Sequence, residues 1–110
     1  MQTPAMDTKL ELIAVLERLE AFFIKHKIME WAARSTQALQ MLKSDVRPRA
    51  VIRDYAGKGM GSLGDLVVDQ EYNGHDYHGL TYTEVNEQLT SLTTEYFSVA
   101  SKFKRRFLLF

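Results

Sequence analysis

Apolar residues recur at intervals of three and four along the first 42 residues, and this spacing constrains the fold more than any other feature. Such spacing places them on one face of a helix. One unbroken helix of this length would have no partner for its apolar face. We therefore predict a bend near His26–Lys27 that makes two antiparallel helices. The predicted apolar faces comprise Leu12, Leu16, Leu19, Phe22 and Phe23, then Ile28, Trp31, Ala32, Ala38, Leu39 and Leu42.

Helix-boundary residues mark where these segments begin and end. The run Thr8-Lys9-Leu10-Glu11 has the pattern of a capping box and predicts the first start, with Thr3-Pro4 as a rival start. Ser44-Asp45 ends the second helix. Pro48 is suited to the first turn of a third, shorter helix that ends at Ala56-Gly57.

A second capping box, Thr81-Tyr82-Thr83-Glu84, predicts the start of the last helix at Thr81 or Thr83. A cluster of basic residues lies at its far end, where the helix dipole favours cations: Lys102, Lys104, Arg105 and Arg106. The apolar stripe of this helix comprises Val85, Leu89, Leu92, Tyr96, Val99, Ala100 and Phe103.

Glycine and turn-forming residues separate the third helix from the last. Four glycines fall within residues 57–64, and Asn73-Gly74 is a strong turn signal. Leu66-Val67-Val68 fits either a short strand or the end of a helical turn. The fold prediction is a mainly α, bundle-like single domain over residues 1–110. It has three to four helices, a structured glycine-rich loop, and room for one short strand or hairpin.

Several classes of protein are disfavoured by what the chain lacks. It has no cysteine and therefore no disulfide framework, and no run approaches the roughly 18 apolar residues of a membrane span. The first seven residues lack the order of a secretory signal. We expect a cytoplasmic protein without a membrane partner. The apolar Phe107–Phe110 is expected to fold back onto the core.

Candidate catalytic and ligand motifs are weak. Gly59-x-Gly61-x-x-Gly64 formally matches a dinucleotide fingerprint, but that motif requires a preceding strand, and here a basic, helix-like segment precedes it. His75-Asp76-Tyr77-His78 offers two imidazoles without a further obvious ligand, and we expect exposed histidines. No nucleophile motif is present. We therefore predict a protein that is not an enzyme, without cofactor, metal or small-molecule substrate.

Charge is unevenly distributed although the formal net charge is +0. Residues 43–58 hold five basic residues, whereas residues 59–101 contain no Lys or Arg and seven carboxylates. Such a surface attracts basic partners, and tyrosine is a favoured interface residue. Alternatively, these carboxylates simply face solvent and have no binding role. The predicted partner-binding residues are Asp65, Asp69, Glu71, Tyr72, Asp76, Tyr77, Glu84 and Glu87.

The run from Arg53 to Val68, with Gly59-Met60-Gly61-Ser62-Leu63-Gly64-Asp65-Leu66 at its centre, resembles a family of small uncharacterised bacterial proteins. The family pattern has adjoining glycines where Lys58 intervenes here, and asparagine at the position of Gly64. By analogy with small proteins that accompany bacterial toxins, the resemblance implies an immunity protein. Its partner would be a cognate basic toxin, such as a nuclease. A nucleic-acid-associated domain using Arg47, Arg49, Arg53 and residues 102–106 is the weaker alternative.

Overall fold

A computed structural model describes the backbone of residues 4–57 and 62–108, and the side chains of residues 7–57 and 62–103. The described chain is mainly helical and contains no strand, which confirms the predicted fold class. Its elements are α1 (Pro4–Lys25), α2 (Met29–Lys43), α3 (Pro48–Tyr55), the 3-10 turn η1 (Leu63–Asp65), α4 (Gln70–Asn73) and α5 (Tyr82–Leu108).

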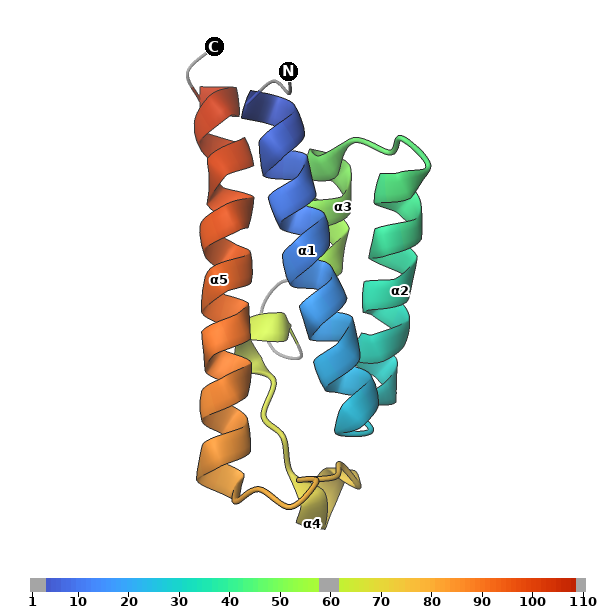
Figure 1. Cartoon of the computed structure of the whole chain (residues 1–110), viewed down its shortest axis with the longest axis vertical. Coiled ribbons are helices and arrows are strands. Elements are labelled where there is room, and N and C mark those ends of the chain that lie inside the picture. Colours follow the sequence, from blue (N-terminus) through green and yellow to red (C-terminus); the bar gives the residue numbers. More distant parts are fainter. Residues whose placement is uncertain (1–3, 58–61, 109–110) are drawn as a thin grey trace.

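The three long helices run along a body 46 Å in its longest dimension (Figure 1). Helix α1 packs against both α2 and α5, and the shorter α3 contacts α2 and α5 from behind. The start of α1 and the end of α5 lie at the same end of the body. The α1–α2 turn and α4 lie at the opposite end.

The predicted apolar stripes form the core. Every residue named above for the faces of α1 and α2 is buried, as are all the named residues of α5 except the half-buried Leu92. From α3 the core receives Val51 and Tyr55, and from the segment before α4 it receives Leu63 and Val68. Burial of these apolar faces is the main stabilising contribution in such a fold.

The predicted bend at His26–Lys27 is confirmed. Helix α1 ends at Lys25, Lys27 takes a left-handed conformation with φ 59°, and the amide of Ile28 donates to the carbonyl of Phe23 at 2.8 Å. This pattern closes the end of a helix in the manner of a Schellman turn. The chain can therefore reverse and lay α2 against α1.

Of the two predicted starts for α1, the capping box at Thr8 is wrong. The helix begins at Pro4, as the rival start predicts, and Thr8 is buried inside it. The second capping box is confirmed: the Glu84 amide donates to Thr81 Oγ1 at 3.1 Å, and the Thr81 amide donates to Glu84 Oε1 at 2.9 Å. Pro48 begins α3 as predicted.

The glycine-rich loop is closed at its base. The amide of Leu63 donates to the carbonyl of Ala56 at 2.8 Å, and Gly57 has a left-handed φ of 73°. A side chain at Gly57 would be strained in this conformation. Residues 58–61, with most of the dinucleotide-like motif, lie outside the described residues, as does the predicted packing of Phe107–Phe110.

Leu66-Val67-Val68 forms neither the strand nor the helical turn considered from the sequence. The segment belongs to no helix or strand, and Leu66 has an extended backbone with φ −70° and ψ 133°. The side-chain amide of Asn86 pairs with the backbone of Val68 as a neighbouring strand would. Val68 donates its amide hydrogen to Asn86 Oδ1 at 2.8 Å and accepts from Asn86 Nδ2 at 3.0 Å. Both polar backbone groups of this buried residue are thereby satisfied.

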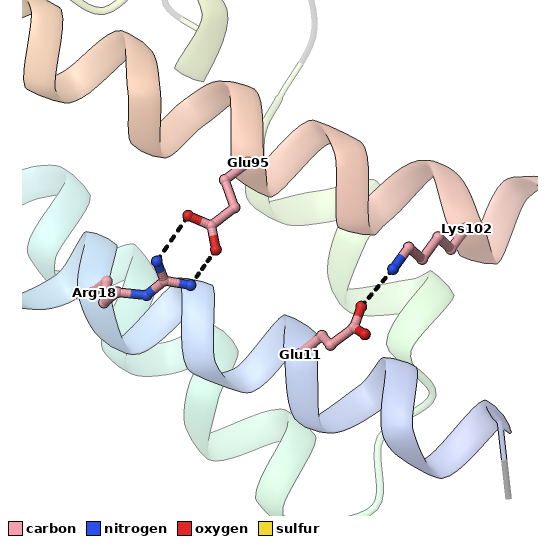
Figure 2. Close-up of polar contacts among 4 residues, drawn as sticks. All are labelled: Glu11, Arg18, Glu95 and Lys102. Atoms are coloured by element: carbon pink, nitrogen blue, oxygen red, sulfur yellow. Dashed lines mark hydrogen bonds and ion pairs between the residues drawn. The ribbon is translucent and has the colours of Figure 1, made fainter.

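Among the side chains that the structure describes, two ion pairs join α1 to α5 (Figure 2). Arg18 makes a two-pronged contact with Glu95, in which Nη1 donates to Oε2 at 2.7 Å and Nη2 to Oε1. Lys102 donates to Glu11 at 2.7 Å. The partners are seven residues apart on each helix, so both pairs belong to one antiparallel register.

Candidate protein-binding site

The predicted contact region lies mostly on the segment that joins η1 to α5. Asp69 caps α4, because its Oδ1 accepts from the amides of Glu71 at 3.0 Å and Tyr72 at 3.3 Å. Gly74, with φ 69°, ends this single turn in the left-handed conformation. The cap therefore holds Glu71 and Tyr72 on the outer surface, where Tyr72 is 85% exposed.

A pair of hydrogen bonds attaches this segment to the α1–α2 turn. His26 Nδ1 lies 2.6 Å from the carbonyl oxygen of Asp76, and the Asp76 amide donates to the carbonyl of His26 at 2.8 Å. A carbonyl oxygen only accepts, so Nδ1 of His26 carries the hydrogen. His26 is fully buried with its ring 4.5 Å from that of Phe22, and its Nε2 has no hydrogen-bond partner among the described residues.

The two histidines of the His75–His78 motif lie in different surroundings. His75 is half-buried, and its Nδ1 accepts the amide hydrogen of Asp69 at 3.0 Å. Burial lowers the pKa of His75, and the negative charge of Asp69 opposes that effect. His78 is exposed, as predicted. Within the described residues no three His, Asp or Glu side chains are placed to share a metal ion.

A groove of about 600 Å³ lies between the α1–α2 turn and the segment from Ser62 to His75. We call it the end groove. Two exposed apolar side chains contribute to it, Met29 at 60% exposure and Val67 at 41%. Its lining residues are Lys27, Ile28, Met29, Glu30, Trp31, Ser62, Asp65, Leu66, Val67, Asn73 and His75.

The end groove is lined by one predicted contact residue, Asp65, and by Asn73 at the end of α4. It also adds Met29 and Glu30, which sequence reasoning did not single out. The predicted bend at His26–Lys27 was the available signal, since it places the first residues of α2 at the end of the bundle. Nothing in the sequence indicates which later segment would lie against them.

Four of the eight predicted contact residues have local structural roles. Asp69 caps α4, and Asp76 Oδ1 accepts the amide hydrogen of His78 at 2.8 Å. Glu84 belongs to the capping box, where hydrogen bonds from Thr81 lower the pKa of its carboxyl group. Tyr77 is half-buried, with its ring 6.3 Å from that of Tyr82.

The other four predicted contact residues, Asp65, Glu71, Tyr72 and Glu87, are exposed. Asp65 is the one that lines the end groove, and Glu71 and Tyr72 directly precede its Asn73. Glu87 lies on α5 and is not among the groove-lining residues. Three of these four residues therefore lie at or next to α4 and the end groove, and Glu87 lies on another element.

Residues 59–101 contain no Lys or Arg, but residues from elsewhere in the chain bring positive charge to this acidic stretch. Lys27, contributed by the α1–α2 turn, lines the same groove as Asp65 and Glu30. Glu95, the last of the seven carboxylates, is paired with Arg18. A count of charges along the chain could not detect the Arg18–Glu95 pair or the position of Lys27 in this groove, because each brings together residues distant in sequence.

One of the basic residues proposed for the alternative nucleic-acid function, Lys102, pairs with Glu11. Lys43, which precedes the proposed Arg47 in the same basic run, lies 3.9 Å from Glu17. The side chains of Lys104, Arg105 and Arg106 lie outside the described residues. Such pairing reduces the positive potential that a phosphate backbone would meet.

Comparison of the chain with protein-family models, with curated proteins and with solved structures gave no match. In the described part of the chain, none of the helices combines the length and apolar character needed to cross a membrane.

Proposed function

We propose that this chain is a non-enzymatic protein-binding domain of the cytoplasm, and specifically an immunity protein that neutralises a cognate basic toxin of the nuclease type. The observation that carries the proposal is the exposed pair Glu71 and Tyr72 on α4, directly beside a groove lined by Glu30, Asp65 and Met29. Aromatic anchors beside a pocket are typical of residues that dominate binding energy.

Charge complementarity supports a basic partner. The end groove and α4 together carry Glu30, Asp65 and Glu71 against the single cation Lys27 among the residues described there. A nuclease must present a basic surface to its substrate, and an acidic inhibitor can occupy that surface in place of phosphates. Attraction of this kind speeds association and weakens as salt screens it.

Co-expression with the product of the neighbouring gene tests the proposal. We expect the two proteins to copurify as a stable complex and the toxin to lose its toxicity to the host cell. Glu71→Lys and Tyr72→Ala should each weaken the complex tenfold or more, by about 1.4 kcal/mol or above.

Asp54→Lys is a matched control, because Asp54 is an exposed acid on α3 away from the end groove. It changes the net charge as Glu71→Lys does and should leave the affinity nearly unchanged. Equal losses for the two charge reversals would refute the site. Salt-sensitive binding to DNA or RNA, abolished by Arg47→Glu and with no protein partner captured, would favour the alternative function instead.

A further inference from the structure

A second hollow lies between α3 and α5. This α3–α5 cleft has a volume of about 550 Å³, within the range of small-ligand sites. It shares none of its lining residues with the end groove. The lining residues are Arg49, Ile52, Arg53, Ala56 and Gly57 from α3 and its C-terminal end, and Tyr96, Phe97, Ala100, Ser101 and Phe103 from α5.

The cleft combines apolar walls with charge of one sign. Phe97 and Phe103 supply aromatic surface from α5, opposite Ile52 on α3. Arg49 and Arg53 are four residues apart on α3 and so share one face. No acidic residue is among the described residues that line the cleft. The Arg53 side chain is exposed and makes no hydrogen bond or ion pair with another described residue.

The packing of α3 against α5 explains why side chains do not fill the cleft. Where the rings of Tyr55 and Tyr96 meet, with centroids 5.3 Å apart, α3 and α5 are in direct contact. Beside this contact the α5 wall presents the small residues Ala100 and Ser101 to α3. Helix α3, which forms the opposite wall, has eight residues and is roughly 12 Å long at 1.5 Å per residue.

We propose that the α3–α5 cleft binds an alkyl-chain carboxylate. The carboxylate lies against the Arg53 guanidinium, with Arg49 on the same face, and the alkyl chain lies between Phe97, Ile52 and Phe103. Guanidinium groups pair with carboxylates through two parallel hydrogen bonds, and the apolar walls remove the chain from water.

Two other occupants fit the cleft less well. A nucleotide needs polar partners for its sugar and base, but the one Ser/Thr hydroxyl in the described lining, that of Ser101, already donates to the carbonyl of Ser98 at 2.8 Å. A protein interface of ordinary size buries roughly 800 Å² on each partner. Among the described residues, Phe97 is the only exposed large apolar side chain that lines the cleft.

Calorimetric titration of the full chain with sodium dodecanoate, below its micellar concentration, tests the proposal. We expect saturable binding of one molecule per chain, and affinity that falls about fourfold for each methylene removed in decanoate and octanoate. Dodecyltrimethylammonium, which carries the same chain with a cationic head, should bind at least tenfold more weakly.

Arg53→Gln should weaken dodecanoate binding about tenfold or more, because it removes a charge-assisted contact. Phe97→Ala should weaken it about fivefold by removing apolar contact. Both residues are exposed, so the variants should fold, which thermal unfolding will verify. Arg47→Gln is the matched control, since Arg47 precedes the same helix but does not line the cleft.

Absence of saturable dodecanoate binding at millimolar concentration would overturn the proposal, as would equal binding by Arg53→Gln and the unchanged chain. Tighter binding of adenosine monophosphate than of dodecanoate would replace the ligand class with a nucleotide. Tyr72→Ala should leave dodecanoate binding unchanged, so this experiment succeeds or fails independently of the toxin-binding function.

Discussion

The helical body and the segment of residues 62–81 are held together in different ways. In the body, buried apolar faces of α1, α2 and α5 contact one another along their length. The 62–81 segment buries only Leu63 and Val68, and polar contacts from His26 and Asn86 fasten it to the body. The difference implies that this segment, which carries α4, can open locally while the body remains folded.

The largest expected effect is in the body. Phe23→Ala deletes a fully buried ring and should lower the free energy of unfolding by about 3–5 kcal/mol. The adjacent Ile24 is 54% exposed, so Ile24→Ala should cost far less. Urea unfolding followed by circular dichroism measures both variants. Similar losses would mean that the apolar body does not dominate stability.

The attachment of the 62–81 segment should respond to a single polar residue. His26→Ala removes the hydrogen bond to Asp76 and leaves a cavity beside Phe22, at an expected cost of about 1–3 kcal/mol. Hydrogen exchange at the Asp76 amide should accelerate more than exchange in the middle of α1. His78 is exposed and its ring centroid lies 6.3 Å from that of His26, so His78→Ala serves as a comparison and should change both rates far less than His26→Ala. Uniform acceleration would show that the segment and the body open together.

Two tyrosines in contact inside the body should behave differently when their hydroxyls are removed. Ser35 Oγ donates its hydrogen to the carbonyl of Trp31, so the Tyr55 hydroxyl, 2.6 Å from Ser35 Oγ, is the donor to it. Burial raises the pKa of Tyr55 to about 12. Tyr55→Phe should therefore cost about 1 kcal/mol. Burial also raises the pKa of Tyr96, whose hydroxyl has no partner among the described residues, so Tyr96→Phe should be neutral or stabilising. Thermal unfolding of the two variants compares them, and the reverse order would contradict the assigned hydrogen bonds.

The smallest expected effect is a pH dependence of stability that arises from His75 in the 62–81 segment. Because the pKa of His75 is lowered from 6.5 in the folded chain, the unfolded chain binds more protons between the two values. The contribution of His75 to stability is complete above pH 6.5 and is lost as the pH falls through its folded value. Protonation of Nδ1 also breaks the hydrogen bond from the Asp69 amide.

Amide exchange at Asp69, corrected for its intrinsic pH dependence, should therefore become less protected on acidification from pH 7 to pH 5. In His75→Ala this protection should be low at both pH values. A change in the unaltered chain that persists undiminished in the variant would assign the effect to another group.

Where local structure depends on residues close by in the sequence, it could be predicted from the sequence. Helical spacing identified the buried faces, and Pro48 and the Thr81–Glu84 box identified two helix starts. The helix start predicted at Thr8 was wrong because a capping pattern does not exclude an earlier start, and the helix begins at Pro4. The end groove was not predictable, since it depends on Lys27 and Glu30 meeting a segment some 35 residues away. The conformation of Val68 could not be predicted either, because the side-chain amide of Asn86, and not a neighbouring strand, makes the hydrogen bonds of its backbone.

The two ion pairs of Figure 2 also determine which misalignments of α1 and α5 are unfavourable. A slip of seven residues in one direction would bring Glu11 opposite Glu95, and the opposite slip would bring Arg18 opposite Lys102. Each slip would thus replace two attractions by a repulsion. Exposed pairs of this kind contribute only about 0–1 kcal/mol to stability. Their larger effect is on alignment, because four side chains disfavour sliding of the helices in both directions.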